Sequence, residues 1–512
     1  MKKLIFIICF ILLFPALGLA AEYYVDCSLS DPETTSAGTY ANPFYLISEA
    51  NAQGYATGDD VYFKVNTTCN LTEATGFEID WVGTVGNRAI IGAYYGDGLF
   101  GLNGQTRPIL DGQSRAYPSS AFETGGIQRL SATDQGSTYI TVKDLHIYNV
   151  KSHGVVFKYH DDLIVDNVYT QNTIQRGIMF ARCNNGVIQN STVERASYNT
   201  TPGGGIVITG VDETDSADGN QVIGNTVFHN FEGIGAYKKA TNTIIENNIV
   251  YDNRQLGIYA ETSKNTIIRY NLVYYSSDTG SWDGPDEGIL IDNEDAGGYC
   301  FTGGHEVYGN FIAGALYGII MGSDIQQQGT DANCDQDNNL FYNNTIVDSV
   351  SSNFCFWQAG AAGWSGNEFK NNISVIFTAG SQHTCADTHD GDTTWTTNTF
   401  DNSIDTVSGD ASASNYSTSD PSLVGGSSGW RSLTAGAVTT APFKLTVGSV
   451  CIDSGTDIGT YPTDDFARDY WLTNRDTYTP WDIGAHEFEG TPPSTSGAAP
   501  FFGVYCQGCK FN

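Results

Sequence analysis

The chain has 512 residues, with 57 Asp or Glu against 24 Lys or Arg, so its formal net charge at neutral pH is −33. A surface with this excess of negative charge repels nucleic acids and anionic membranes and argues against both as partners. It also repels a polyanionic glycan, unless bound cations or a local basic patch compensate.

Residues 1–21 predict a secretory signal peptide. Two lysines precede an apolar run from Leu4 to Leu19, and small residues end at Ala21. This order of basic, apolar and small residues is typical of a cleaved export signal, although an uncleaved membrane anchor is the alternative. The run is short for a membrane span, and no later stretch is apolar enough for one. We therefore expect a secreted protein, extracellular or at the cell surface.

Residues 22–130 are interpreted as an N-terminal cap followed by the first coils of a repeat. The chain has 11 cysteines, and removing Cys9 with the signal peptide leaves an even number, ten. An even count in an exported chain predicts disulfides. We expect Cys27 and Cys69 to pair across the cap, with free buried thiols as the alternative.

Residues 131–410 contain a repeat whose shortest period is about 23 residues. Segments such as "QVIGNTVFHN" from Gln221 and "TIIENNIVYDN" from Thr243 align on one polar column. Its members are Asn167, Ser191, Asn225, Asn248, Asn271, Asn310, Asn344 and Asn372. Longer spacings, up to the 39 residues between Asn271 and Asn310, indicate insertions in some coils.

A column of glycines follows the polar column after about nine residues. Its members are Gly154, Gly177, Gly205, Gly233, Gly257, Gly288 and Gly318, and most precede an alternating β-branched segment such as "GIYAE". Glycine suits a backbone that turns with positive φ or packs tightly.

Short strands at a constant period predict an all-β, right-handed parallel β-helix of about a dozen coils. Residues one coil apart then lie about 4.8 Å from each other. Inward residues form one apolar stack, namely Val227, Val250, Val273, Ile312 and Ile346. The asparagines form a hydrogen-bonded ladder. A propeller has a longer period, and the leucine pattern of a leucine-rich repeat is missing.

The same stacking predicts a second disulfide. Cys300 lies ten residues before Asn310, and Cys334 lies ten residues before Asn344. The two cysteines therefore occupy one column on adjacent coils, within the Cα separation of roughly 4.4–6.8 Å that a disulfide requires. Two free buried thiols are the alternative.

The strands after the glycines predict an outward face that carries a candidate site. Strand parity places Lys158, Ala181, Thr209, Tyr237, Glu261 and Asp292 on one line. Lys158, Arg182, Tyr237, Lys238 and Glu261 are the candidate catalytic residues. Tyr259, Tyr274, Tyr275 and Trp282 are candidates for stacking on sugar rings. Asp283, Asp286, Glu287, Asp292, Glu294 and Asp295 are candidate ligands for Ca²⁺, which prefers carboxylate oxygens.

Two kinds of chemistry fit these residues. A lyase needs a base beside a uronate whose carboxylate is neutralised, commonly by Ca²⁺, and Lys238 or Lys158 with Tyr237 and Arg182 suits that role. A hydrolase needs two carboxylates, and Glu261 with Asp292 is the available pair, although one strand spacing is tight even for a retaining mechanism. Solvent-exposed lysines and loop acids without any function are the alternative for each candidate.

Residues 411–489 are interpreted as closing coils, and residues 490–512 as a linker and tail. The linker "GTPPSTSGAAP" is rich in Pro, Ser and Gly, and the tail "FFGVYCQGCKFN" is apolar with two cysteines. The tail is expected to fold over the open end of the solenoid and hide its last strand edge. Attachment of the protein to a surface is the alternative.

The chain resembles the secreted right-handed parallel β-helix proteins of the pectate-lyase-like superfamily. The motifs that carry this resemblance are the N-terminal "GTYANPFYLISEA" and "TGDDVYFKVNTT", and the C-terminal "DPSLVG", "FKLTVGSVCIDSGTDIG" and "DIGAHEF". The resemblance covers about Tyr23 to Phe488 and implies fold and export. It implies activity only weakly, because this fold supports lyases, hydrolases, epimerases and adhesins.

We therefore expect a secreted protein that acts on or binds an acidic polysaccharide of the pectate or alginate type, most simply as a calcium-assisted lyase. A non-catalytic surface or adhesive protein and a glycoside hydrolase are the alternatives.

Overall fold

The computed structural model describes residues 20–29, 36–71, 76–113, 125–197, 203–210, 216–276, 286–293, 301–322, 336–357, 366–378, 382–386, 394–396, 398–400, 416–417, 421–426, 430–431, 433, 436, 440–455, 468–475 and 481–488.

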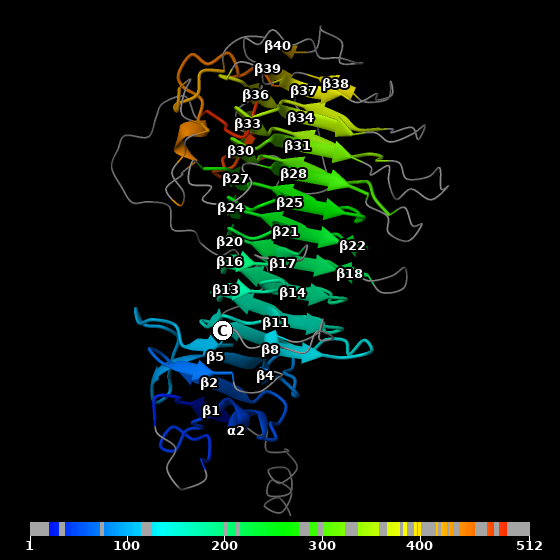
Figure 1. Ribbon diagram of the computed structural model, residues 1–512. Helices are drawn as coiled ribbons and strands as arrows, with labels where there is room; N and C mark the ends of the chain where they lie inside the picture. Colours follow the sequence, from blue (N-terminus) through cyan, green and yellow to red (C-terminus); the bar gives the residue numbers. More distant parts are fainter. Residues whose placement is uncertain are drawn as a thin grey trace, which may run out of the picture.

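Three long sheets of parallel strands run side by side along one axis (Figure 1). Sheet 1 consists of β4 (Phe77–Glu78), β8 (Gly125–Leu130), β11 (His153–Lys158), β14 (Ile178–Ala181), β17 (Gly204–Thr209), β21 (Glu232–Tyr237), β25 (Leu256–Glu261), β28 (Glu287–Asp292), β31 (Tyr317–Gly322), β34 (Ser352–Trp357) and β37 (Gln382–Ala386).

Sheet 2 consists of β1 (Glu22–Val25), β2 (Asp60–Lys64), β5 (Ala89–Gly96), β9 (Ile140–Lys143), β12 (Ile164–Asp166), β15 (Val187–Gln189), β19 (Gln221–Ile223), β23 (Ile244–Glu246), β26 (Ile267–Arg269), β29 (Glu306–Tyr308), β32 (Leu340–Tyr342), β35 (Glu368–Lys370) and β38 (Thr394–Thr396). The short strand β6 (Leu99–Phe100) pairs antiparallel with β5.

Sheet 3 consists of β3 (Thr68–Asn70), β7 (Ile109–Asp111), β10 (His146–Tyr148), β13 (Tyr169–Thr173), β16 (Thr192–Ala196), β20 (Thr226–Phe228), β24 (Ile249–Tyr251), β27 (Leu272–Tyr274), β30 (Phe311–Ala313), β33 (Thr345–Val347), β36 (Ile373–Val375), β39 (Asn398–Phe400) and β40 (Tyr416–Ser417). A small extra pair joins β18 (Ala217–Asp218) to β22 (Ala240–Thr241).

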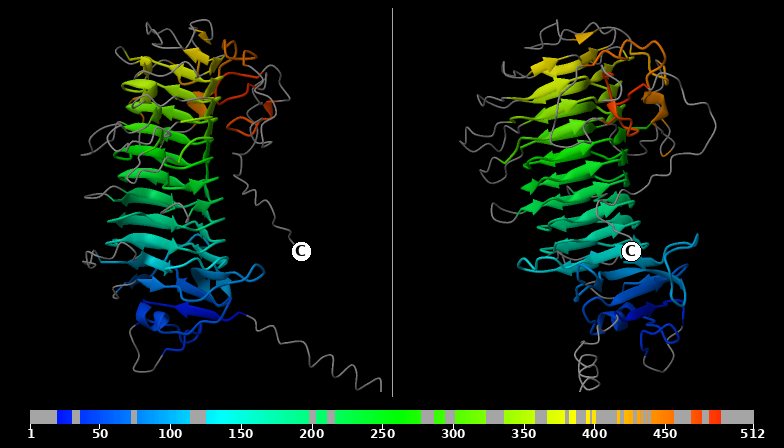
Figure 2. Two further views of the ribbon diagram at one scale, coloured as in Figure 1. Left: turned by 90° about the vertical axis from the view of Figure 1, so that its right-hand side faces the viewer. Right: turned by 180° about the vertical axis from the view of Figure 1, so that it is seen from behind.

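Each coil contributes one strand to each sheet in turn, as β21, β23 and β24 do before the chain returns to sheet 1 at β25. The views from the side and from behind show the same stack of coils (Figure 2). In the described residues the only helices are α2 (Ile47–Asn51) and the 3₁₀ turn η1 (Ala441–Phe443). The chain is therefore an all-β parallel solenoid, as its repeat predicts.

The core of the solenoid is a continuous stack of aliphatic side chains. Val227, Val250 and Val273 are fully buried and are successive register partners in sheet 3. Ile312 and Ile346 continue the same line and are also fully buried. The inward positions predicted from the sequence are confirmed, because period-two alternation leaves one face of each strand for the core.

The asparagine ladder lies at the turn between sheets 2 and 3. The Asn248 amide Nδ2 donates to Asn271 Oδ1 at 3.0 Å, and Asn271 Nδ2 donates to Asn310 Oδ1 at 3.0 Å. One assignment was wrong: Val168, not Asn167, occupies the first position, because the Val168 backbone N–H donates to Ser191 Oγ. Asn167 instead takes a left-handed turn conformation with φ 53° and bonds to Asp144.

The glycine column serves close packing rather than positive φ. A Cβ atom on Gly318 would lie 2.5 Å from the Asn353 carbonyl oxygen and 2.5 Å from Ile346 Cγ2. No residue other than glycine fits there without moving the neighbouring coil. Of the two reasons that the sequence offered for these glycines, tight packing is the one that applies at this position.

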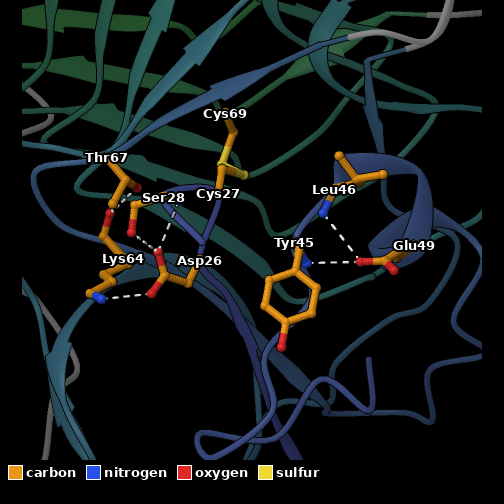
Figure 3. Close-up of a disulfide and its surroundings, with 9 residues drawn as sticks. All are labelled: Asp26, Cys27, Ser28, Tyr45, Leu46, Glu49, Lys64, Thr67 and Cys69. Carbon is orange, nitrogen blue, oxygen red and sulfur yellow. Dashed lines mark hydrogen bonds and ion pairs between the residues drawn. A yellow bond between two sulfur atoms is a disulfide. The ribbon is translucent and has the colours of Figure 1, made fainter. Parts of the chain in front are cut away.

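The N-terminal cap is closed by a disulfide between Cys27 and Cys69, which confirms the predicted pair (Figure 3). Lys64 lies 2.6 Å from Asp26 beside this bond, and Glu49 accepts from two backbone N–H groups at the start of α2. Cys300 and Cys334 lie outside the described residues, so their predicted bridge stays a prediction. Cys355 is disulfide-bonded and stands in register with Cys385 of the next coil.

The C-terminal segment packs on the flank of the solenoid, where the sequence predicts closing coils. Its described residues between 421 and 488 lie beside the upper coils (Figures 1 and 2). Trp430 and Phe443 pack on Phe311, whose side chain points outward from sheet 3. Ala485 N donates to Thr345 Oγ1 across 140 residues of sequence. The reason is that the outer side of sheet 3 is apolar here and must be covered.

In the part of the chain that the structure describes, none of the helices is long and apolar enough to span a bilayer.

Candidate functional site

The outer side of sheet 1 carries the predicted line of residues. Register pairs run from Lys158 through Ala181 and Thr209 to Tyr237, and then to Glu261 and Asp292. Lys158, Thr209 and Glu261 are half-buried, whereas Tyr237 and Asp292 are 5% exposed. Strand parity thus positions these side chains as expected, with one coil of spacing between successive members.

A hydrogen bond between Tyr237 and Glu232 lies at the middle of this line. The Tyr237 hydroxyl donates to Glu232 Oε2, and both side chains are buried. The ring of Tyr237 folds back over Gly235, where any Cβ atom would overlap it. Burial, followed by the charge of Glu232, raises the pKa of Tyr237 well above its ordinary value. Tyr237 therefore keeps its proton and acts as a donor.

Glu232 was not identified from the sequence. Glu232 precedes Gly233, and a Cβ atom added to Gly233 would point toward Val250 in the core. The regular alternation of inward and outward side chains is therefore interrupted at this glycine. Counting by twos from Tyr237 assigns position 232 to the wrong side. The acid immediately before the glycine was the only signal, and it is informative only when the bend is known.

A basic and aromatic group lies on the lower coils of the same side. The Arg182 guanidinium lies 4.5 Å from the centre of the Tyr159 ring, and Lys158 Nζ lies 5.9 Å from it. Such contacts hold cations over an aromatic face. Lys238 is exposed just beyond the end of β21, where its backbone N–H donates to the Glu261 carbonyl at 3.0 Å.

An acidic group lies on the upper coils. Asp292 Oδ1 accepts from the backbone N–H of Asn293 at 2.7 Å, and Glu261 is the register partner of Asp292. The Asn293 side-chain amide is buried and has no hydrogen-bond partner among the described residues. Two carboxylates one coil apart, with a buried amide one residue further along the chain, supply the kinds of oxygen that suit a hard cation. Among the described residues, no three His, Cys, Asp or Glu side chains form a metal-binding group.

Asp286 and Glu287 form a second acidic pair at the start of β28. Burial is the main cause that raises the pKa of Glu287 to about 9, and the hydrogen bond and charge of Asp286 add to it. Glu287 is thus protonated at neutral pH. It stands two strands from Glu232, with Leu256 between them in register.

Three aromatic candidates are buried. Tyr259 is 3% exposed, and its ring lies 5.6 Å from that of Tyr237. Tyr274 lies on sheet 3 beneath the C-terminal segment, where its hydroxyl accepts from the Gly436 N–H. Tyr275 belongs to the main core. The structure thus places Tyr274 and Tyr275 inside the protein and away from the outer side of sheet 1, because β27 ends on sheet 3 before the chain turns.

Four further candidates lie outside the described residues, namely Trp282, Asp283, Glu294 and Asp295. Their expected contributions to sugar and calcium binding stay predictions.

Comparisons with known proteins show the fold. Residues 130–312 match the family model described as "right handed beta helix region", so the predicted handedness is confirmed. The complex structure of XylC with xylose aligns with 91% of this chain and 98% of its own, at 10% identity and a TM-score of 0.53. A comparison with the curated proteins found no match.

Two further solved structures are similar. A rhamnogalacturonan lyase aligns with 72% of this chain and 84% of its own, at 16% identity and a TM-score of 0.49. PfbA, a surface adhesin of Streptococcus pneumoniae, aligns with 69% of this chain and 81% of its own, at 11% identity and a TM-score of 0.47. At these identities and TM-scores, neither likeness bears on the function of this chain.

Proposed function

We propose that this right-handed parallel β-helix protein is exported and binds an acidic polysaccharide along the outer side of sheet 1, which it cleaves by β-elimination. The observation that supports this most is the register line from Lys158 to Asp292, which brings a basic group and an acidic group onto one side of the solenoid. Because the chain as a whole repels polyanions, a local basic group or a bound cation has to compensate for a uronate to bind.

Each group has a part in this proposal. Arg182 and Lys158 attract the uronate carboxylates. Glu261, Asp292 and the Asn293 amide oxygen would hold Ca²⁺, which supplies charge neutralisation of the carboxylate next to the acidic carbon. Lys238 is the base that removes the proton from that carbon. Tyr237 does not suit a base because burial and Glu232 keep its proton in place.

The test is the release of unsaturated sugars from polygalacturonate and alginate, followed by ultraviolet absorbance with calcium or with a chelator. Lys238→Ala is expected to lower the rate by a factor of about 10²–10⁴, as loss of a general base does. Lys143→Ala is the matched control, since Lys143 ends β9 on sheet 2, away from the site. Absence of any unsaturated product from these glycans contradicts the lyase.

Glycoside hydrolysis is a second candidate, supported by Glu287. An inverting hydrolase needs a protonated acid and a base roughly 6.5–9.5 Å apart, and two strand spacings of about 4.7–4.9 Å place the backbones at the upper limit of that range. Glu287, with its raised pKa, and Glu232 fit these roles by position. Reducing ends formed without ultraviolet absorbance, and lost in Glu287→Gln, are expected for a hydrolase. The lyase instead gives absorbance that Glu287→Gln leaves intact.

A further inference from the structure

Among the described residues, the C-terminal segment covers the outer side of sheet 3 in its upper coils and leaves the lower coils open. The C-terminal segment buries Tyr274 and Phe311, whereas Ile249 is 36% exposed and Phe228 is half-buried. We call the outward residues of β7, β10, β13, β16 and β20 the open face. In Figure 1 the labelled strands β13, β16 and β20 lie below the part of the solenoid that the C-terminal segment flanks.

Aromatic rings on this side are stacked along the axis. Phe228 stacks on Tyr251 with ring centres 4.8 Å apart, and Tyr251 stacks on Tyr274 at 5.0 Å. Below them, His146 stacks on Tyr169 at 4.4 Å. Phe228 is the half-buried lower end of the upper stack, and its register partner in the next strand down is Glu194. Rings fixed by stacking offer apolar surface at little entropic cost.

Fixed polar groups lie directly below Phe228. The Glu194 carboxylate accepts from the Tyr169 hydroxyl and from Gln171 Nε2 at 2.9 Å, and Arg195 lies 3.3 Å from its other oxygen. Burial and the bond to Glu194 raise the pKa of Tyr169 far above its ordinary value, so its hydroxyl remains a donor. Donors and acceptors are thus held in place before any ligand arrives.

The chemistry of the open face fits a sugar chain better than a protein. The core of a protein interface is apolar and depleted in charged residues, whereas Thr, Gln, Glu, His and Tyr dominate here. The Asp111 carboxylate repels a polyanion, and Glu194 on the same line already neutralises Arg195, so the described residues of this line offer a polyanion no unpaired cation. Alternating rings and hydrogen-bonding groups match the C–H faces and hydroxyl groups of neutral sugars. Five strands extend about 19 Å, enough for several sugar units.

We propose that the open face of sheet 3 is a second carbohydrate-binding surface, which takes a neutral, hydroxyl-rich polysaccharide. It is separate from the outer side of sheet 1 and does not depend on the reaction proposed there. Phe228 and Tyr148 provide the apolar contact, and the half-buried Tyr169 and Gln171, which the buried Glu194 holds in place, provide hydrogen bonds to hydroxyl groups.

Affinity electrophoresis of the full chain in gels containing xylan, glucomannan or polygalacturonate tests this surface. The two neutral polysaccharides are expected to retard the protein. Phe228→Ala and Tyr148→Ala are each expected to raise the dissociation constant about tenfold, as loss of a stacking contact does. Phe228→Tyr, which keeps the ring, is expected to retain binding. Ile244→Ala is the matched control, since Ile244 is equally half-buried on the outer side of sheet 2 in the next coil.

Two results overturn the proposal: no retardation by either neutral polysaccharide, or unchanged retardation in both alanine variants with native circular dichroism. The double variant Lys158→Ala and Arg182→Ala separates the two surfaces. It is expected to weaken binding of polygalacturonate and to leave xylan binding intact. Loss of xylan binding in that variant assigns the neutral glycan to sheet 1 and overturns the second surface, whatever the outcome for cleavage.

Discussion

Single residues on the outer side of sheet 1 depend on the glycines between them. Gly235 leaves the space that the Tyr237 ring occupies, and Gly233 makes the bend that brings Glu232 outward. Parity along a strand predicted the side on which Tyr237, Glu261 and Asp292 lie. It failed at Glu232, because the irregularity at Gly233 inside β21 resets the alternation, and no residue type signals on which side the next polar group emerges.

Glu287 makes stability depend on pH, and Glu287→Gln tests this. The pKa of Glu287 is raised to about 9 in the folded chain, against about 4.3 in an unfolded one. The stabilisation of the folded chain that comes from protonated Glu287 is therefore complete below pH 4 and is lost as pH rises toward 9. Because glutamine cannot ionise, the variant is expected to be more stable than the wild type at pH 8, on the order of 1–2 kcal/mol, and equal at pH 4.

Thermal unfolding followed by circular dichroism at the two pH values measures this difference. Asp286→Asn, which removes the neighbouring charge, is expected to reduce the same pH dependence. A wild type whose midpoint changes with pH no more than that of Glu287→Gln would argue against a raised pKa.

At the scale of strands and turns, packing against the neighbouring coils restricts which residues each coil can carry at its glycine and asparagine positions. The glycine column lets the backbones of successive coils approach, and the asparagine ladder closes the turn between sheets 2 and 3. Both features were visible in the sequence, because a solenoid turns a sequence period into spatial contact. The displacement of Asn167 by one position was not visible, since Asn is equally suited to the ladder and to a left-handed turn.

Gly318→Ala is expected to destabilise the upper coils by about 1–3 kcal/mol, because its methyl group overpacks against a neighbouring backbone oxygen and a core isoleucine. Gly86→Ala is the matched control, since no atom lies within 4 Å of a Cβ atom there. Urea unfolding of the two variants measures the difference. Equal urea midpoints in the two variants would mean that neighbouring coils move apart to accept the added methyl group without any loss of stability.

The whole molecule is a stack that must be closed at its ends and covered where its outside is apolar. The cap disulfide ties the segment that follows β1 to β3 across a sequence separation of 42 residues. At the other end, the C-terminal segment returns to the flank, where Tyr270 donates to the Arg468 carbonyl across 198 residues. This arrangement leaves the lower part of sheet 3 open and so creates the second surface.

Replacing both Cys27 and Cys69 by serine is expected to destabilise the cap by about 4 kcal/mol, the chain-entropy value for a loop of this length. Amide hydrogen exchange in β1 and β2 measures the effect locally, and the central strands β21 and β25 serve as an internal control. Exchange in the cap strands that matches the wild type would show that packing alone holds the cap closed.

The sequence by itself determined the coil, its inward residues, the cap disulfide and the line from Lys158 to Asp292, because a repeat of about 23 residues makes register a matter of counting. Only the tertiary structure decided which outer surfaces are open. Coverage of Tyr274, the pairing of Tyr237 with Glu232 and the exposure of Phe228 depend on where a distant segment folds back and where a glycine bends the chain. Neither the return of the distant segment nor the bend at the glycine repeats along the sequence, so the repeat pattern could not predict them.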